Sequence, residues 1–179
     1  MSGSSVSGTG DVNGDGLKDL IVGNAGGWNP FGSRNSSATV VFGKTDDTAI
    51  EISTIATETT DDGFVINNVS AGDLTGFSVS GAGDVNGDGL EDLIIGAPND
   101  DPHGSTSGAS FVVFGKTDGG AVELSSLQSS SDNGGFVING VTAGDNSGWS
   151  VSGAGDVNND GYADVIVGAI YDDPNGTSS

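Results

Sequence analysis

The chain has 179 residues and a formal net charge of −21, because 25 Asp and Glu residues are balanced by only 4 Lys and Arg residues. Such a composition excludes nucleic-acid binding through a basic patch, and it argues against electrostatic docking on an anionic membrane. The absence of Cys excludes disulfides, zinc–thiolate sites and Cys nucleophiles. No apolar run approaches the roughly 20 residues that cross a bilayer, so we expect no membrane insertion. Residues 1–10 resemble no signal peptide, and we expect any export signal to have been removed or to lie outside this sequence.

Glycine is the second unusual feature of the composition. It accounts for 33 of the 179 residues, whereas average proteins contain about 7% glycine. The other apolar residues reach 34% of the chain, which together with glycine matches a globular protein. The chain is therefore not a disordered acidic tail, and its glycines are expected to serve the backbone.

Internal repeats dominate the sequence and determine the predicted architecture. Three segments align without gaps, and their first aspartates, Asp11, Asp84 and Asp156, are separated by 73 and then 72 residues. The similarity continues outside these segments, since residues 39–46 match residues 111–118. The three aligned segments are residues 10–23, 83–96 and 155–168.

Each period predicts four short strands, rich in Val, Ile and Phe and bounded by Gly, Asn, Asp and Pro. Nothing longer shows a helical period. The best helix candidates are residues 49–55 and 121–127, which we expect to form no more than a turn and to fill a gap between neighbouring sheets. In the middle period the predicted strands are residues 76–82, 92–97, 110–115 and 135–141.

Four strands in a repeat of this length are typical of a β-propeller blade. We therefore predict an all-β fold of about two and a half blades, each of four antiparallel strands, in an incomplete ring. Residues 1–75 are assigned to blade 1, residues 76–147 to blade 2 and residues 148–179 to the first half of blade 3. Because such a set cannot close on itself, we expect either a longer parent chain or association with other copies.

Each repeat also carries the pattern Asp-x-Asn-x-Asp-Gly-x-x-Asp. Oxygen-bearing side chains at positions 1, 3, 5 and 9, a glycine at position 6 and a backbone carbonyl at position 7 suit a hard cation with six or seven oxygen ligands. Three carboxylates in one tight loop would repel each other without a cation, and Mg²⁺ fits less well because it prefers a smaller octahedron and retains its waters. We predict about three Ca²⁺ sites, one in each loop. The predicted ligands are Asp11, Asn13, Asp15, Leu17 and Asp19; Asp84, Asn86, Asp88, Leu90 and Asp92; and Asp156, Asn158, Asp160, Tyr162 and Asp164.

The loop allows two other interpretations. One Asp-Asn-Asp cluster could be only a solvated turn of a hairpin, but three copies in phase favour calcium. An EF-hand is excluded because position 12 is Val22, Ile95 or Val167 instead of Glu, and because predicted strands flank the loop.

The combined motif resembles the FG-GAP repeat of integrin α-subunit propellers and their bacterial relatives. It consists of Gly76-Phe77 before a strand, the calcium loop, and then Gly96-Ala97-Pro98. The resemblance covers essentially the whole chain and implies a seven-bladed β-propeller with the calcium loop between the first two strands of a blade. The first unit departs from the motif, because it has Gly3-Ser4 in place of the Gly-Phe pair. The third unit has Gly148-Trp149 at that place.

Several other residues were considered as functional candidates. The pair Asp100-Asp101 could serve glycoside hydrolysis, and His103 could act as a general base. The favoured interpretation of the aspartate pair is a repeated loop that could lend an oxygen to the nearby cation, and that of His103 is a solvated loop, so no catalytic residue is predicted. Trp28 could bind a partner or a sugar, or it could equally pack within the longer loop that contains it. Asn35, Asn68 and Asn175 begin glycosylation sequons.

The sequence thus predicts a non-catalytic, extracellular or cell-surface calcium-binding segment that serves adhesion, recognition or surface assembly. A self-assembling subunit of an extracellular filament and an accessory domain of a secreted hydrolase are the alternatives. The expected partners are proteins or other copies of the chain, bound through an edge strand or a blade face, with glycans as a further class. The predicted strand at residues 163–168 has no Lys or Pro to protect its edge, and we expect it to recruit another strand.

Overall fold

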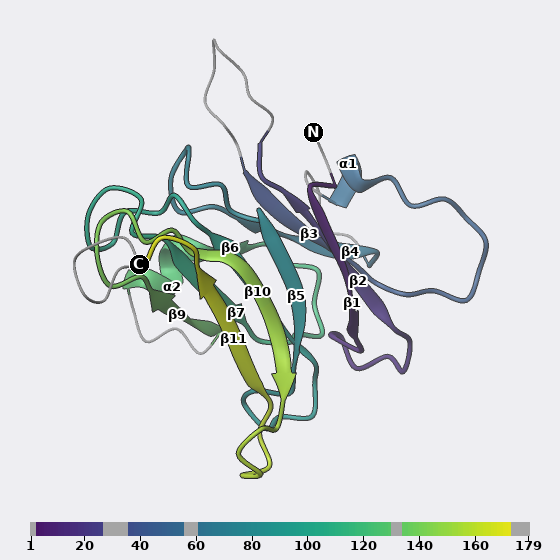
Figure 1. Ribbon diagram of the computed structural model, residues 1–179. Coiled ribbons are helices and arrows are strands. Elements are labelled where there is room, and N and C mark those ends of the chain that lie inside the picture. Colours follow the sequence, from purple (N-terminus) through teal and green to yellow (C-terminus); the bar gives the residue numbers. More distant parts are fainter. Residues whose placement is uncertain (1–2, 27–35, 56–60, 130–133, 173–179) are drawn as a thin grey trace.

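The computed structural model describes residues 3–26, 36–55, 61–129 and 134–172. Within them the fold is all-β, with three sheets stacked face to face and two short helices (Figure 1). The strands of each sheet run antiparallel, apart from one short parallel addition. This arrangement confirms the prediction of an incomplete β-propeller with blades of antiparallel strands.

We call the first sheet blade 1. Its strands lie in the order in which they occur along the chain. The first two form a hairpin whose register shifts between Gly8 and Gly10, before the turn. They are β1 (Ser5–Gly10), β2 (Asp19–Asn24), β3 (Ser37–Val41) and β4 (Gly63–Asn67).

Blade 2 repeats this architecture, and each of its strands overlaps one predicted from the middle period. Its strands are β5 (Ser78–Gly83), β6 (Asp92–Ala97), β7 (Ala109–Val113) and β9 (Gly135–Asn139). The third sheet, which we call the third hairpin, consists of β10 (Ser147–Gly155) and β11 (Asp164–Ala169).

The segment between β7 and β9 differs from its predicted form. Val122 and Glu123 form a strand, β8 (Val122–Glu123), that pairs in parallel with Ile66 and Asn67 at the outer edge of blade 1. The Asn67 side-chain amide also donates a 2.6 Å hydrogen bond to Glu123 Oε1. The predicted helical turn at residues 121–127 therefore begins later than expected, because pairing with another blade outweighs local preference. The two helices are α1 (Ile52–Ile55) and α2 (Leu124–Ser129).

Two apolar cores hold the sheets together. The larger core lies between blades 1 and 2, where Ile21 and Phe64 meet Leu93 and Phe111. Leu124 of α2 is buried in this same core, as expected for a segment that fills a gap between sheets. The smaller core lies between blade 2 and the third hairpin, and includes Ala82, Ile94, Val112 and Val151.

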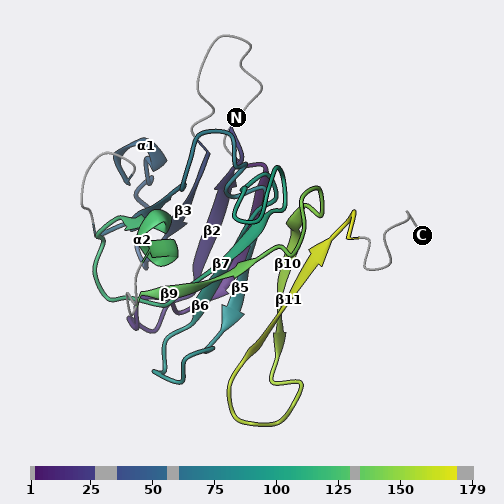
Figure 2. The same cartoon turned by 90° about the vertical axis from the view of Figure 1, so that its left-hand side faces the viewer.

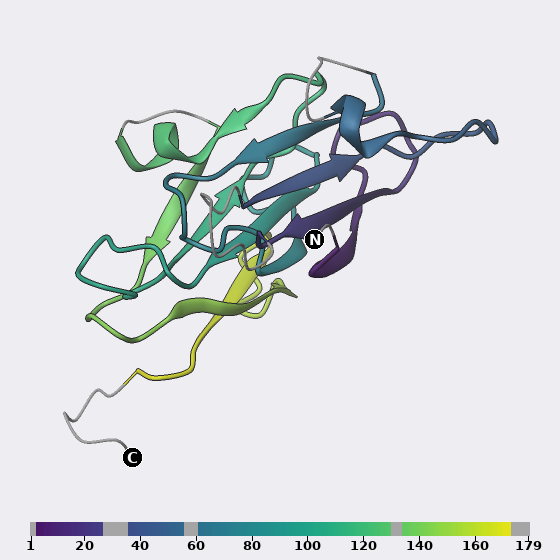
Figure 3. The same ribbon diagram turned by 90° about the horizontal axis from the view of Figure 1, so that it is seen from above.

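Alternation along the strands explains why blade 2 can serve both cores. Leu93 and Ile95 of β6 belong to the larger core, whereas Ile94 between them belongs to the smaller one. Successive side chains of a strand point to opposite faces of the sheet, so β6 is buried on both sides and all of its residues after Asp92 are apolar. Figures 2 and 3 accordingly show the third hairpin on the side of blade 2 that faces away from blade 1.

Glycine permits the close approach of neighbouring sheets. A Cβ atom built on Gly96 would lie 2.0 Å from the carbonyl oxygen of Gly148, and one built on Gly23 would lie 2.1 Å from that of Gly76. Contacts this short are not possible between a carbon and an oxygen, so these positions accept only glycine. The abundance of glycine in the composition thus has a packing cause as well as a turn cause.

We therefore expect Gly96→Ala to destabilise the fold by about 1 to 3 kcal/mol, the usual cost of overpacking. Chemical denaturation followed by circular dichroism would measure the change. Gly8→Ala is the matched control, because Gly8 lies in β1 and a Cβ atom there would have no neighbour within 4 Å. Equal stability of the two variants would contradict this role of Gly96.

Candidate metal centre

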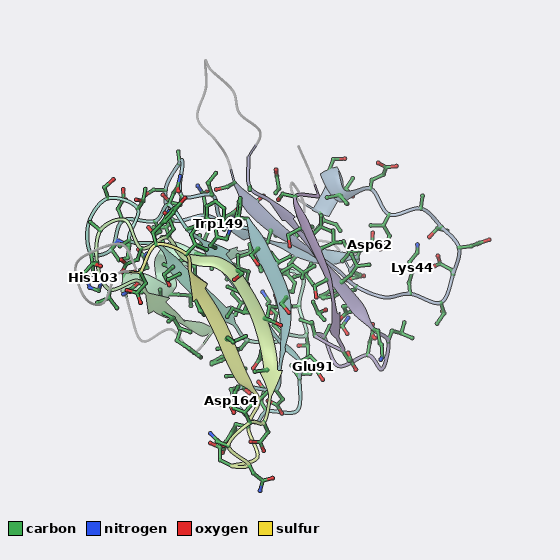
Figure 4. All side chains as sticks on the ribbon, viewed as in Figure 1. Lys44, Asp62, Glu91, His103, Trp149 and Asp164 are labelled. Atoms are coloured by element: carbon green, nitrogen blue, oxygen red, sulfur yellow. The ribbon has the colours of Figure 1, made fainter. Side chains whose placement is uncertain are left out.

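The three Asp-x-Asn-x-Asp-Gly loops connect the first two strands of each sheet, and they lie at the same end of the molecule (Figure 1). Figure 4 shows Asp164 at the base of its loop, on the lower side of the view, with Glu91 of the neighbouring loop region on the same side. The structure therefore places each predicted ligand set in one hairpin turn, as the spacing predicts.

The first aspartate of each loop organises the turn. Asp11 accepts hydrogen bonds from the backbone N–H groups of Gly14 (2.7 Å) and Asp15 (3.1 Å) through Oδ1, and from that of Gly16 (2.8 Å) through Oδ2. Gly14 and Gly16 have φ values of 79° and 87°, which glycine adopts without steric cost. The loop is thus wound around the carboxylate of position 1.

The second loop has the same geometry and the third nearly so. Asp84 accepts bonds of 2.7, 3.1 and 2.9 Å from Gly87, Asp88 and Gly89. Asp156 accepts bonds of 3.1 and 2.9 Å from Asp160 and Gly161. Asn159 takes the place of the first glycine in the third loop and also has a positive φ of 62°, a conformation that Asn tolerates better than most residues.

Positions 3 and 5 are linked to each other in every loop. In the first loop the Asn13 side chain donates to Asp15 Oδ2 (3.0 Å) and accepts from the Asp15 backbone N–H (3.0 Å). Asp15 Oδ1 accepts from the N–H of Leu17 (2.7 Å). The equivalent contacts recur at Asn86–Asp88 and Asn158–Asp160. The position 7 residues are Leu17, Leu90 and Tyr162, of which Tyr162 is the most exposed.

The aspartate at position 9 ties the loop to the body of the blade. Asp92 is fully buried, and its oxygens accept hydrogen bonds from the N–H groups of Val85 (2.8 Å), Asn86 (3.3 Å) and Gly115 (2.8 Å). In blade 1 the buried Asp19 accepts 2.7 Å bonds from Val12 and Gly43 in the same way.

The third loop lacks this anchorage among the described residues. Asp164 is half-buried, and the recorded contact of its carboxylate is a 2.9 Å bond from the N–H of Val157. The glycine donors to the other two aspartates, Gly43 and Gly115, follow the third strand of their blades and were not assigned a role from the sequence. The repeated Phe-Gly-Lys-Thr-Asp segment that contains them was the available signal.

Burial raises the pKa of the position 9 aspartates of blades 1 and 2, which we call the closing aspartates because they close the loop. Desolvation raises the pKa of Asp92 to about 6 despite the three backbone donors, which act in the opposite direction. Desolvation also raises the pKa of Asp19, and the charges of Asp15 and Asp11 add to the increase. A buried carboxylate with a raised pKa is one that a nearby positive charge would stabilise.

The oxygen ligands of each loop suit a hard cation. In this structure the same side chains accept hydrogen bonds from backbone N–H groups. Each loop offers only oxygen ligands, and an oxygen that accepts a single hydrogen bond, such as Asp11 Oδ2 or Asp84 Oδ2, retains a second lone pair. Among the described residues, the recorded ion pairs are Lys44–Asp46 and Lys116–Asp118, neither of which involves a loop carboxylate. In the same part of the chain, acidic and His side chains form no group of three or more placed to hold a metal ion. Binding would therefore require the acidic side chains of a loop to come closer together than they lie in this part of the chain.

The other candidate residues lie elsewhere. His103 is at the left of the view in Figure 4, away from Asp164 at the bottom, and its Nδ1 lies 2.7 Å from the carbonyl oxygen of Gly140. Asp100 follows β6, at the opposite end of that strand from the loop, and its carboxylate accepts a 2.7 Å hydrogen bond from Gln128. The sequon residue Asn68 follows β4. Trp28, Asn35 and Asn175 lie outside the described residues.

The comparisons with known proteins agree with this architecture. The family model of the FG-GAP repeat matches residues 2–41, 75–122 and 147–179, one segment for each sheet and together well over half of the chain. No curated protein matches the chain. In the described part of the chain, no helix is long and apolar enough to cross a membrane. With three matched segments that each contain a hairpin and its aspartate-rich loop, the chain belongs to the FG-GAP repeat family.

Proposed function

We propose that the chain is a calcium-binding segment of an extracellular or cell-surface protein, that it has no catalytic activity of its own, and that it serves adhesion, recognition or surface assembly. The observation that carries the proposal is the threefold recurrence of one loop geometry with the same oxygen donors and with no cationic side chain recorded at its carboxylates. Extracellular calcium, at millimolar concentration, matches the affinity typical of such modules.

In each loop the ion would be held by the carboxylates of positions 1, 5 and 9, the Asn amide oxygen and the position 7 carbonyl. Its charge would offset the repulsion between the acidic side chains and would compensate the buried carboxylates Asp19 and Asp92. The ion would thus cross-link the turn to the strand that follows it. The role is structural, because it rigidifies the end of each blade on which the loops lie.

Support for a non-catalytic role comes from the surroundings of the acidic and His residues. Asp100 is bound to Gln128 and follows β6 at the opposite end of that strand from the aspartate-rich loop, and His103 lies against a backbone carbonyl. FG-GAP propellers are generally non-catalytic, which favours a binding or assembly role over an enzymatic one. An accessory domain of a secreted hydrolase is compatible with the same architecture.

Isothermal titration calorimetry tests the calcium proposal directly. Protein freed of metal by chelation and dialysis is expected to bind about three Ca²⁺ ions, with dissociation constants on the order of 10⁻⁴ to 10⁻³ M. Asp84→Asn combined with Asp88→Asn should remove one site, since both carboxylates of the second loop become neutral while their size is kept. Mg²⁺ titration is the matched control. A flat calcium titration would overturn the proposal.

A further inference from the structure

The first two aspartate-rich loops lie in neighbouring blades, and backbone hydrogen bonds join them at two places. The N–H of Glu91, which is labelled in Figure 4 and directly precedes β6, donates to the carbonyl oxygen of Asp11 in the first loop (3.1 Å). The N–H of Lys116, which follows β7, donates to the carbonyl oxygen of Val12 (3.0 Å). We call these two hydrogen bonds the loop contacts. They hold the beginning of the first loop against blade 2.

Each loop contact lies beside a group that fixes the closing aspartate of the second loop. Glu91 immediately precedes Asp92 in the chain. Lys116 immediately follows Gly115, whose N–H donates to Asp92 Oδ1 (2.8 Å). A shift of Asp92 therefore acts on its direct neighbours in the chain and in the hydrogen-bond network, and these neighbours carry both loop contacts.

The Lys116 contact leads on to the closing aspartate of the first loop. Val12 accepts from Lys116 through its carbonyl oxygen, and its own N–H donates to Asp19 Oδ2 (2.7 Å). Three hydrogen bonds of 2.7 to 3.0 Å thus connect the two closing aspartates, both of which are buried. We call this connection, Asp92–Gly115–Lys116–Val12–Asp19, the relay path.

Side-chain packing between the two loops supports the same connection. Leu90 is position 7 of the second loop, and a Cβ atom built on Gly14, position 4 of the first loop, would lie 3.0 Å from Leu90 Cδ2. The Glu91 side chain lies against Gly10 in the same way, with Cγ 2.6 Å from the place of a Cβ atom. Because Leu90 contributes a predicted carbonyl ligand to the second loop, its position depends on both loops.

The second and third loops repeat part of this arrangement. The N–H of Ala163 donates to the carbonyl oxygen of Asp84 (3.0 Å), one repeat after the first loop contact. A Cβ atom on Gly87 would lie 2.6 Å from the ring of Tyr162, which is position 7 of the third loop. Direct contact between adjacent loops is therefore a recurrent property of the chain.

These contacts make the state of one loop matter to the other. Binding of an ion requires the acidic side chains of a loop to come closer together than they lie in the described residues. In the second loop this adjustment involves Asp92, so it also positions Gly115 and Lys116. The conformational cost of placing this shared segment is incurred by whichever loop is filled first. The loop that is filled second then binds at a lower cost, which is positive coupling.

Electrostatic repulsion alone gives coupling of the opposite sign. Each loop carries three carboxylates, and an ion bound in one loop lowers the attraction of the neighbouring loop for a second ion. Salt at about 0.15 M screens this effect beyond about 8 Å. The sign of the coupling therefore distinguishes a mechanical connection from a purely electrostatic one.

We propose that the segment Gly115-Lys116 couples the first two loops, so that filling either loop with Ca²⁺ raises the affinity of the other. The inference rests on the proposed calcium function and adds to it a mutual regulation of the sites. Gly115 and Lys116 are positioning residues in this scheme, since neither supplies a predicted ligand. The consequence is a sharper response of this end of the blades to calcium concentration than independent loops would give.

Nuclear magnetic resonance follows the loops one by one, because the glycines at position 6, Gly16, Gly89 and Gly161, each report on a different loop. A calcium titration of the ¹⁵N-labelled, metal-free chain in about 0.15 M KCl gives one occupancy curve for each loop. The curves of the first and second loops are expected to be steeper than those of independent sites, with a coupling of at least about fivefold. Independent curves, or curves flattened by repulsion, would overturn the proposal.

A proline substitution tests the relay path. Lys116→Pro removes the N–H that donates to Val12 and keeps the Gly115 N–H that donates to Asp92, so the first two loops should then titrate independently. Lys116→Ala is the matched control. It removes the ion pair with Asp118 and the contact with the Phe64 ring but keeps the N–H, and it should retain the coupling. Equal coupling in the two variants would contradict the relay path.

A glycine substitution tests the same segment if the proline variant does not fold. A Cβ atom on Gly115 would lie 2.6 Å from Leu90 Cβ and 2.8 Å from the Val12 carbonyl oxygen, so Gly115→Ala displaces the segment from both loops and should weaken the coupling. Gly43→Ala is the matched control, because its Cβ atom would meet blade 1 itself, 2.5 Å from the Lys18 carbonyl oxygen. It should lower the affinity of the first loop and leave the coupling factor unchanged. The same coupling factor in both glycine variants would show that the segment has no such role.

The titration separates failure of the coupling from failure of the calcium proposal. If no loop signal responds to Ca²⁺, the calcium proposal is wrong and the coupling is wrong with it. If all three loops respond and the first two titrate independently, the loops bind calcium and only the coupling is wrong.

Discussion

Addition of about 5 mM Ca²⁺ to metal-free protein is expected to raise the unfolding midpoint by about 10 °C or more. Binding to the folded form alone, with the affinity of extracellular modules, stabilises by roughly 1 to 2 kcal/mol at each site. The three proposed sites would stabilise the same stack of sheets, and each kcal/mol shifts the midpoint of a chain of this size by about 2 to 4 °C. The expected rise of the midpoint is large because, without metal, the folded chain holds three acidic loops together while its net charge is −21.

Differential scanning calorimetry in chelator and in Ca²⁺ measures this shift. A solution of NaCl at matched ionic strength controls for general screening of the charge, which would also raise the midpoint somewhat. MgCl₂ at the same concentration controls for divalent charge, and should stabilise less. If the calcium midpoint equals that in NaCl, the loops are turns without a metal role.

The second large effect is expected from the closing aspartate of the middle loop. In Ca²⁺, Asp92→Ala should destabilise the fold by about 3 kcal/mol or more, because it leaves buried N–H groups without an acceptor, at about 1 to 3 kcal/mol each. Those donors include Val85 and Gly115, each 2.8 Å from the carboxylate. The variant also removes a predicted calcium ligand from the loop that lies between two neighbouring sheets.

Asp164→Ala is the matched substitution in the third loop and should cost about 1 kcal/mol. Asp164 is only half-buried, and its one recorded backbone donor is Val157. Urea denaturation of both variants at saturating Ca²⁺ would compare them, and Asp92→Asn would show how much of the loss is restored by an oxygen acceptor at the same place. Equal losses for the two alanine variants would show that the surrounding blade has no influence.

The sequence alone determined the repeat, the strands and the composition of the loops. These features are local: a turn of the form Asp-x-Asn-x-Asp-Gly is closed by hydrogen bonds that span two to five residues, such as those of Asp11 with Gly14 and Gly16. The strands are marked by apolar residues and are bounded by turn residues, so each middle-blade strand overlaps its predicted range. Periodicity then predicts the blades, because one repeat carries one complete set of strands.

Only the tertiary structure decided what depends on neighbours one repeat away. The pairing of β8 with blade 1 could not be predicted, because Val122 and Glu123 carry no local strand signal and meet Ile66 and Asn67 only after the blades have stacked. The three closing aspartates hold the same place in the repeat, yet Asp92 is fully buried and Asp164 is half-buried. Gly115, which follows the third strand of the same blade, covers Asp92, whereas the described part of the third sheet has two strands. Likewise Ile21 and Ile166 occupy the same place in the repeat, but the first lies in a core and the second on an open face, because only the first has a following sheet against it.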